Sequence, residues 1–421
     1  MKLKRFLLNH YPPGIILEFL NPSGQVESKC INLPNLSLKT DIDILVTHIS
    51  LEEPLITPDK KPQLCKLIKK LINKPENKQT FSLYRIFRPH TLPLTNCKFN
   101  KLGDKFITGS YDRTCKIWDT NTGQELVSLD GHRNAVYSMA FNNRFNDRIA
   151  TGSFDRTAKI WDANNGNCLR TLIGHQKEVI CIDFDSNGYL FTTGSMDNLA
   201  LLWDAETGKQ IYSFKGHTRE IVSIKFNTDG DKILTGSFDY KSRIWDTRTG
   251  ICVRVLEGHT GEISSAHFDP SSEYVATGSI DRTCKLWDII SGKCFDTLYG
   301  HTDEILDITF NSTGTKLATA SADHFSRIYC INTGVCLNVL VGHEGEICKV
   351  DFNPQGSNII TASCDKNCIV WDADTGDCLQ VLKGHTGDVF SCDFNYEGDT
   401  VITGSKDDTC IIWKDKIDFE E

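Results

Sequence analysis

Residues 216–259 read GHTREIVSIKFNTDGDKILTGSFDYKSRIWDTRTGICVRVLEGH. Four short runs within this stretch, Ile221–Phe226, Lys232–Ser237, Ser242–Asp246 and Val253–Leu256, are rich in β-branched and other apolar residues. Turn-forming Asn, Asp, Thr and Gly residues separate them. Short runs bounded by such residues are typical of antiparallel strands joined by hairpins. The stretch therefore predicts four short strands in succession.

The same unit recurs along the chain. Gly-His pairs occur at residues 131–132, 174–175, 216–217, 258–259, 300–301, 342–343 and 384–385. The first spacing is 43 residues and the others are 42, and Pro89-His90 stands 42 residues before the first pair. A Trp follows seven of the eight histidines by 28 or 29 residues, and Tyr329 stands at the remaining place. Such a constant period indicates a repeat architecture, here with eight units over residues 80–415.

This spacing of Gly-His and Trp-Asp resembles the WD-repeat β-propeller family. The resemblance implies an all-β fold, an eight-bladed propeller over residues 80–415 with four strands to each blade. The last repeat stops near Trp413, before a fourth strand, whereas Phe81–Phe87 is a spare strand pattern ahead of the first repeat. We expect this N-terminal strand to pair into the last blade and close the ring, which removes an exposed sheet edge. A seven-bladed ring with one stray repeat is the alternative.

Asp and Thr also recur at fixed offsets. An Asp lies six residues before each Trp and before Tyr329, and a Thr lies four residues before each Asp. In the family, the His, Asp, Thr and Trp side chains form a hydrogen-bonded tetrad. A buried Asp needs donors, and the other three side chains supply them. Because the set occurs eight times, we interpret it as structural and not catalytic, and we expect Tyr329-Cys330 to weaken one tetrad.

Residues 1–79 do not fit the repeat and predict a small α+β domain. Gly14–Leu33 reads as a hairpin, Asp41–Glu53 as a helix and Pro62–Asn73 as an amphipathic helix with Lys66, Lys69, Lys70 and Lys74 on its surface. With 12 basic and 8 acidic residues, the segment has a net charge of +4. Because the whole chain has a net charge of −9, the remainder has a net charge of −13. The lysine face, Lys66, Lys69 and Lys70, is a candidate partner-binding surface. Attraction to the acidic ring or contact with a membrane surface are the alternatives.

The whole-chain composition excludes several functions. With 46 basic against 55 acidic residues, we expect no nucleic-acid partner, since duplex binding needs a large basic footprint. No apolar run approaches the roughly 18 residues of a membrane-spanning helix, and Met1–His10 lacks the apolar core of a signal peptide, so we expect no membrane insertion. Residues 416–421 read as an acidic C-terminal tail.

Nothing in the sequence predicts catalysis. The 17 cysteines include no paired CxxC, which favours free thiols in a reducing compartment over a zinc site. The chain has no phosphate-binding loop, GxGxxG, GxSxG or HExxH motif, and the loops between repeats are nearly constant in length. We therefore expect no enzyme activity, no catalytic residue, no metal and no cofactor.

Two series of residues suggest a protein-binding face. By strand alternation the residue before each tetrad Asp should point to one end of the ring, and five consecutive blades place large apolar residues there: Tyr111, Phe154, Met196, Phe238 and Ile280, followed by Ala322, Cys364 and Lys406. Exposed apolar patches mark interaction surfaces, although these side chains could instead pack against neighbouring loops. An acidic residue lies three positions after the His in six blades, at Glu178, Glu220, Glu262, Glu304, Glu346 and Asp388. This series predicts a ring of negative charge, a negative collar, at one mouth of the central channel. The alternative is that it forms only the polar turn of each repeat.

The whole chain is also similar to the family of dynein assembly factors with WD repeats. Three features carry this resemblance: the N-terminal segment with Met1–Phe6 and Tyr11–Gly14, the eight repeats, and an end just after the last Trp. The resemblance implies a non-enzymatic cargo adaptor, monomeric, in cytoplasm and cilium or flagellum, including the basal body and axoneme. It implies two partners, a subunit of the intraflagellar transport B complex and preassembled outer-arm axonemal dynein, with the transport contact beside Lys66, Lys69 and Lys70.

Two other functions remain open. Trp245-Asp246-Thr247-Arg248 matches the WDxR motif of substrate receptors of cullin-type ubiquitin ligases. A generic WD-repeat scaffold is the other possibility. Binding to the ligase's adaptor through Arg248 would distinguish the receptor from the dynein adaptor.

Overall fold

The computed structural model describes residues 2–9, 14–20, 26–33, 42–53, 56–57, 60–72, 79–88 and 90–416. The chain divides into two compact units, Met1–Lys78 and Gln79–Glu421. The first unit holds a three-stranded sheet and two helices, and the second holds eight four-stranded sheets. Within the described ranges, no helix is both long enough and apolar enough to pass through a bilayer.

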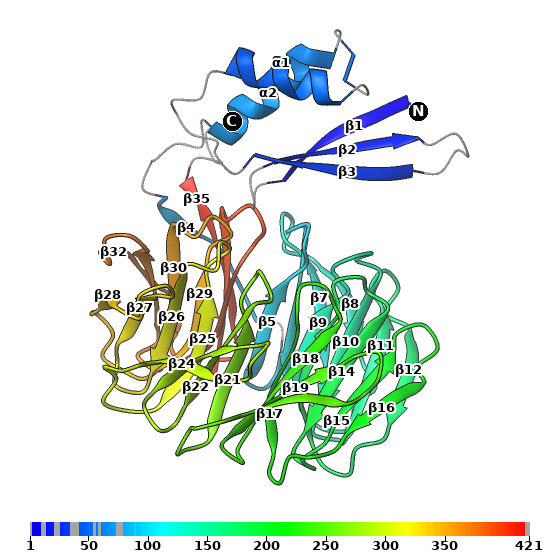
Figure 1. Cartoon of the computed structure of the whole chain (residues 1–421). Helices are drawn as coiled ribbons and strands as arrows, with labels where there is room; N and C mark the ends of the chain where they lie inside the picture. The colour runs from blue at the N-terminus through cyan, green and yellow to red at the C-terminus, as the bar shows by residue number, and fades with distance from the viewer. Residues whose placement is uncertain are drawn as a thin grey trace. The chain divides into compact units, whose positions relative to one another are not determined.

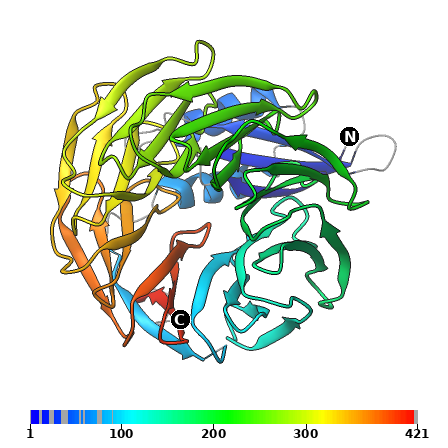
Figure 2. The same ribbon diagram turned by 90° about the horizontal axis from the view of Figure 1, so that it is seen from below.

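The eight sheets of the second unit are antiparallel and follow one another around a ring, as Figures 1 and 2 show. Blade 1 contains β5 (Leu94–Phe99), β6 (Lys105–Ser110), β7 (Cys115–Asp119) and β8 (Glu125–Leu129). Blade 2 contains β9 (Val136–Phe141), β10 (Arg148–Ser153), β11 (Thr157–Asp162) and β12 (Cys168–Ile173). Blade 3 contains β13 (Val179–Phe184), β14 (Leu190–Ser195), β15 (Ala200–Asp204) and β16 (Gln210–Phe214). Blade 4 contains β17 (Ile221–Phe226), β18 (Lys232–Ser237), β19 (Lys241–Asp246) and β20 (Cys252–Glu257).

The second half of the ring repeats this plan. Blade 5 contains β21 (Ile263–Phe268), β22 (Tyr274–Ser279), β23 (Cys284–Asp288) and β24 (Cys294–Leu298). Blade 6 contains β25 (Ile305–Phe310), β26 (Lys316–Ser321), β27 (Ser326–Cys330) and β28 (Cys336–Leu340). Blade 7 contains β29 (Ile347–Phe352), β30 (Asn358–Ser363), β31 (Asn367–Asp372) and β32 (Cys378–Lys383). Blade 8 contains β33 (Val389–Phe394), β34 (Thr400–Ser405), β35 (Cys410–Asp415) and β4 (Phe81–Phe87). The fold is an eight-bladed β-propeller, so the seven-bladed alternative is wrong.

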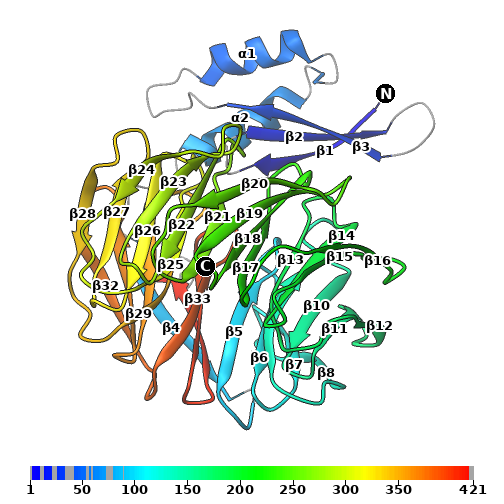
Figure 3. The same cartoon turned by 60° about the horizontal axis from the view of Figure 1, so that its bottom comes forward.

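The hydrophobic core lies between neighbouring blades. First strands of adjacent blades contact one another, as β13 does with β9 and β17, so the first strand of each blade is innermost (Figure 3). One cluster of buried side chains fills each of the eight interfaces. Between blades 4 and 5, for example, Leu234, Ile244 and Leu256 pack with Ile263 and Trp287. Burial of apolar surface at every interface holds the ring together.

The last blade is completed by the strand that precedes the first repeat. β4 pairs antiparallel with β35, with Phe87 opposite Cys410. This is the pairing that the sequence predicted for Phe81–Phe87. The Phe81 side chain is buried and its ring centre lies 6.1 Å from that of Phe394. Blade 8 also joins blade 1, since the backbone N–H of Phe99 donates to Asp393 Oδ2 (2.8 Å).

A chain of hydrogen bonds ties each blade together, and blade 4 illustrates it. Trp245 Nε1–H donates to Thr235 Oγ1 (2.9 Å), which lies 2.8 Å from His217 Nε2. His217 Nδ1 lies 2.8 Å from Asp239 Oδ2. Because Thr235 Oγ1 accepts the indole N–H, its own proton suits His217 Nε2, and the imidazole then donates from Nδ1 to the carboxylate.

The Asp of each tetrad also fixes a turn. Asp239 Oδ1 accepts the backbone N–H of Lys241 (3.1 Å), and Asp239 Oδ2 accepts that of Thr218 (3.1 Å). Tyr240, between Asp239 and Lys241, has a φ of 70°, a left-handed conformation that is unfavourable for residues other than glycine. All eight blades place a residue of this conformation after the Asp: Arg113, Arg156, Asn198, Tyr240, Arg282, His324, Lys366 and Asp408. The carboxylate hydrogen bonds offset the strain that this turn imposes.

Two tetrads depart from the pattern. In blade 6, Tyr329 replaces Trp, and its hydroxyl donates to the carbonyl oxygen of Tyr299 (3.1 Å). His301 still lies 2.7 Å from Thr319 Oγ1 and 2.8 Å from Asp323 Oδ2. The aromatic residue of this blade thus donates to Tyr299 and not to the tetrad Thr319. This confirms the sequence prediction that Tyr329 weakens the tetrad. In blade 8 the His–Asp distance is longer, at 3.4 Å.

The first unit is a small α+β fold. Its sheet has the order β1 (Lys2–Asn9), β2 (Gly14–Leu20), β3 (Val26–Asn32), and its helices are α1 (Ile42–Glu52) and α2 (Lys61–Ile72). Buried side chains from the sheet and both helices form one core: Phe6, Ile15, Leu17, Leu33, Val46, Ile49, Ile56, Leu64 and Ile68. The sequence predicted the β2–β3 hairpin and both helices, but not β1. Residues 417–421 of the predicted tail lie outside the described residues.

Loss of the closing strand's anchor should destabilise the ring. Phe81→Ala removes a buried ring from blade 8, so we expect the free energy of unfolding to fall by about 3–5 kcal/mol. Leu83→Ala is the matched control, because Leu83 lies on the same strand with 45% of its surface exposed. Urea unfolding of both full-length variants measures the difference. Equal losses would contradict the anchoring role of Phe81.

The tetrads should make the ring sensitive to acid. Burial pushes the pKa of Asp323 upward, but hydrogen bonds from His301 and from the Thr302 backbone N–H outweigh burial and lower the pKa to about 2. Hydrogen bonds likewise lower the pKa of the other seven tetrad aspartates. A carboxyl whose folded-state pKa is depressed adds stability above its unfolded value of about 4 and loses it as the pH falls further.

We therefore expect the free energy of unfolding to drop steeply between about pH 5 and pH 2, with Asp323 alone contributing about 2 kcal/mol. Asp323→Asn should be less stable than wild type at neutral pH and should lose less stability on acidification. Asp229→Asn, at an exposed turn, serves as the control and should follow the wild-type pH profile. Urea titrations at several pH values give the comparison. If the free energy of unfolding of Asp323→Asn fell with pH as steeply as that of wild type, Asp323 would not contribute to the acid sensitivity.

Candidate protein-binding surface

The turn between the second and third strands of each blade carries the first predicted series. In blades 1–5 the residue before the tetrad Asp is Tyr111, Phe154, Met196, Phe238 and Ile280. The backbone N–H of Phe238 donates to the carbonyl oxygen of Glu220 (3.0 Å), and that of Met196 donates to Glu178 (3.0 Å). The turn is thus fastened to the loop that enters the first strand. We call this end of the ring the loop face.

The acidic series lies on the same face. In blades 3–8 the carbonyl that accepts this N–H belongs to the acidic residue of the blade: Glu178, Glu220, Glu262, Glu304, Glu346 and Asp388. The two series are therefore neighbours in every one of these blades. Arg219 Nη1 lies 3.5 Å from Glu262 Oε1, and Lys406 Nζ lies 3.0 Å from Asp388 Oδ2. These two basic side chains offset part of the negative charge of the collar.

A third series on the loop face was missed by the sequence reasoning. Every first strand has a bulge against the second strand, and in blades 3–8 the extra residue stands two positions after the acidic one. A bulge interrupts strict alternation and re-aims a side chain, so a period of two could not identify these positions. They are Thr95, Tyr137, Ile180, Val222, Ser264, Leu306, Cys348 and Phe390. Six of the eight carry an apolar, aromatic or thiol side chain.

The best-defined patch on this face is aromatic. The rings of Tyr137 and Phe154 stack with centres 5.3 Å apart, and Tyr111 meets Phe154 edge-on at 6.4 Å. Tyr111 and Tyr137 remain 43% and 41% exposed, whereas Phe154 is half-buried. Phe154 thus supports two accessible tyrosines that belong to blades 1 and 2. Tyrosine offers a large amphipathic contact at low entropic cost, which suits a binding hot spot.

The remaining members of the first series are less accessible than we expected. Phe154 and Met196 pack against the core cluster between blades 3 and 4, which includes the bulge residue Ile180. Phe238 and Ile280 are half-buried. The alternative to an exposed patch was packing against neighbouring loops. For Phe154 and Met196, the structure favours this alternative. Of the five predicted residues, Tyr111 alone is classed as exposed.

A second aromatic pair lies at the other end of the strands. Phe145, in the β9–β10 turn, and Tyr189, in the β13–β14 turn, have ring centres 5.7 Å apart. They are 48% and 62% exposed. β10 starts beside Phe145 and ends beside Phe154, so its six residues, about 20 Å long, separate the two aromatic patches. Phe145 belongs to the turn that holds the extra residue of the 43-residue repeat.

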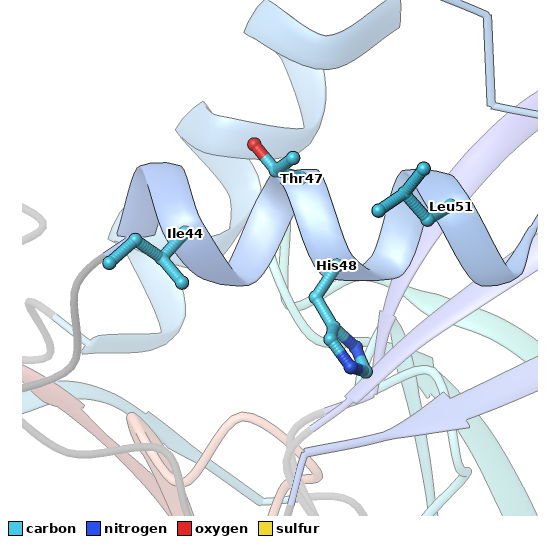
Figure 4. Close-up of a pocket in the computed structure, with 4 residues that line it drawn as sticks. All are labelled: Ile44, Thr47, His48 and Leu51. Carbon is cyan, nitrogen blue, oxygen red and sulfur yellow. The ribbon is translucent and has the colours of Figure 1, made fainter.

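The lysine face belongs to the first unit. Lys66 is exposed on α2, and the side chains of Lys69 and Lys70 lie outside the described residues. The structure therefore does not bring the lysines and the loop-face residues together within one unit. Helix α1 of the same unit has a shallow hollow on one face, lined by Ile44, Thr47, His48 and Leu51 (Figure 4).

The titratable side chains of the tetrads are poorly placed for chemistry. The eight histidine side chains are at most 2% exposed, so no substrate can reach them in this conformation. Among the described residues, no group of three or more His, Cys, Asp or Glu side chains is arranged to hold a metal ion. All sixteen cysteines whose side chains are described are free thiols.

Several curated proteins are similar to part of this chain. Dynein assembly factor with WD repeat domains 1 of Xenopus laevis is 52% identical over 145 residues, which are 34% of this chain and 35% of that protein. The proteins of the same name from Danio rerio and Homo sapiens are 53% identical over 147 residues and 52% identical over 145 residues, again 34% of this chain and 35% of each relative. The matched stretch thus spans about a third of the length of these relatives.

A solved structure and a repeat family match a larger part of the chain. The crystal structure of the computationally designed Ika8 protein aligns with a TM-score of 0.70 and 29% identity, covering 77% of this chain and 97% of that one. The repeat unit described as WD domain, G-beta repeat matches eight times, at residues 81–119, 123–162, 166–204, 208–246, 250–288, 292–330, 334–372 and 376–414. With eight such repeats built into eight blades, the chain belongs to the WD domain, G-beta repeat family.

Proposed function

We propose that the protein is a non-enzymatic adaptor in the assembly of axonemal dynein. The observation that carries this proposal is the identity of about half the residues, over a third of the chain, with proteins named as dynein assembly factors. A rigid ring with exposed aromatic patches and inaccessible tetrad histidines supports binding over catalysis. A fold alone does not define a function, so the partners need a direct test.

In detail, the adaptor would link preassembled outer-arm dynein to the intraflagellar transport B complex for ciliary import. It would act as a monomer in the cytoplasm and the cilium or flagellum, at the basal body and axoneme. The loop-face residues Tyr111, Phe154, Met196, Phe238 and Ile280 would contribute one contact, and Lys66, Lys69 and Lys70 would contribute to the transport side. Neither role requires a cofactor or metal.

An adaptor needs two surfaces that do not compete. The ring offers two aromatic patches at opposite ends of β10, Tyr111 with Tyr137 on the loop face and Phe145 with Tyr189 on the other. All four side chains are more than 40% exposed. Two large partners can approach such separated patches without steric conflict. We therefore propose that each patch contributes to binding one partner class.

The test is capture of partners by tagged full-length protein from an extract of ciliated cells. Tyr111→Ser/Tyr137→Ser should lower the recovery of one class, dynein or transport subunits, by about tenfold or more, since hot-spot truncation costs above 1.4 kcal/mol. Phe145→Ser/Tyr189→Ser should lower the recovery of the other class. The control is Phe295→Ser on the outer strand β24, where Phe295 is 47% exposed; it should retain both.

Thermal unfolding of every variant must show a folded ring. Full recovery of both classes by both double variants would contradict the assignment of these patches. Recovery of cullin-ligase components in place of ciliary proteins, lost with Arg248→Ala, would instead support the receptor function. Arg248 is exposed at the β19–β20 turn, where its side chain could make that contact.

A further inference from the structure

Two thiols lie against each other on the loop face of blade 7. Cys348 is the extra residue of the β29 bulge, and Cys364 is the first residue of the turn after β30. Their Sγ atoms are 3.4 Å apart, and both side chains are only partly buried. No disulfide joins them. Sixteen residues separate them in sequence, so the bulge and the turn create this pair.

We propose that Cys348 and Cys364 are a thiol–disulfide exchange site. The two cysteines form a reversible disulfide with each other, and a low-molecular-weight disulfide such as oxidised glutathione is the oxidant. This inference is independent of the proposed adaptor function. It concerns a covalent modification that the geometry of the ring itself permits.

The geometry requires little movement. A disulfide has an S–S distance of about 2.05 Å, so the two sulfurs must approach by roughly 1.4 Å. Ile347 and Ser363, the residues that precede the two cysteines, already face each other across β29 and β30. Side-chain rotation can supply most of the approach, because one cysteine sits on a bulge and the other on a turn. Partial exposure leaves room for a small disulfide to reach the sulfurs.

The two thiols are not equivalent. Burial raises the pKa of Cys348 strongly, and its hydrogen bond with Cys364 raises the pKa further. Burial and the charges of Asp388 and Glu346 also raise the pKa of Cys364, but they raise it less, because its hydrogen bond with Cys348 and the charge of Lys406 act in the opposite direction. Because the thiolate is the nucleophile, Cys364 is the attacking residue. Cys348, whose thiol has the more strongly raised pKa, is the resolving residue.

The reaction balances with two thiols and one added disulfide. The Cys364 thiolate attacks one sulfur of oxidised glutathione, forms a mixed disulfide and releases one glutathione thiolate. Cys348 then loses its proton to solvent and attacks the Cys364 sulfur, and the second glutathione leaves. The protein loses two hydrogen atoms and two molecules of reduced glutathione form. Reduced glutathione in excess reverses both steps.

The chain contains its own comparison sites. Cys97 and Cys410 also interact, but both are at least 99% buried, so the reagent cannot reach them in the folded ring. Cys168, Cys294 and Cys378 are exposed, and the sulfur contacts of Cys168 and Cys294 are to oxygen atoms. Such thiols should form at most mixed disulfides with glutathione.

The experiment treats the folded full-length chain with oxidised glutathione at mildly alkaline pH. Free thiols are then alkylated, and tryptic peptides are identified by mass spectrometry. We expect a cross-link between the peptide of residues 328–349 and that of residues 350–366, two hydrogen atoms lighter than their sum and located at Cys348 and Cys364 by fragmentation. Excess reduced glutathione should remove it. Cys97 and Cys410 should stay reduced.

Single variants separate the proposal from general oxidation. Cys348→Ser should accumulate a glutathione adduct on Cys364, whereas Cys364→Ser should abolish the cross-link and modify Cys348 slowly. Lys406→Gln should slow cross-linking, and thermal unfolding must show that each variant is folded. Wild-type protein that gains adducts on Cys168 while Cys348 and Cys364 stay reduced or unlinked would overturn the proposal. A Cys97–Cys410 cross-link appearing at the same rate would also overturn it, because it would indicate oxidation of unfolded chain.

Discussion

The contact between the tetrad Asp and its blade is the constraint on which the ring depends. In blade 4, Asp239 receives the His217 imidazole and the backbone N–H groups of Thr218 and Lys241. These bonds hold Tyr240 in a left-handed conformation and fasten the turn to the loop ahead of the first strand. The residue before the Asp, Phe238, is thereby fixed in direction. A structural tetrad thus sets the geometry of the loop face.

Much of the fold was predictable because one period governs it. Eight His residues at spacings of 42 or 43 fix the number of blades, since each unit buries its apolar faces only against its neighbours. The spare strand Phe81–Phe87 was predictable by the same counting, because the last repeat lacked a partner for β35. Outside the period the prediction was weaker. β1 was missed because a register shift between Leu3 and Arg5 interrupts the alternation of basic and apolar residues in Lys2–Asn9.

Which residues lie on the loop face was easier to predict than which of their side chains are exposed. Sequence alternation placed Tyr111 and Phe154 on one face, but it could not show that Phe154 packs into a core while Tyr111 is exposed. Tyr137 escaped notice because a bulge shifts it out of the alternation of β9. Cys348 and Cys364 meet only because one sits on a bulge and the other on a turn. Tertiary irregularities of this kind leave no periodic signal in one sequence.

The equal length of the repeats has a consequence for recognition. Because turns of the same length recur in nearly every blade, the backbone of the loop face varies little, and selectivity must come from side chains on a fixed frame. Blades 1 and 2 place tyrosines there, blade 7 places a thiol pair, and blade 8 places Lys406 against Asp388. A frame held by tetrads loses little conformational entropy on binding, so most of the contact energy is available for affinity. We therefore expect that substitution at a single blade changes the side chains of the loop face without disturbing the ring.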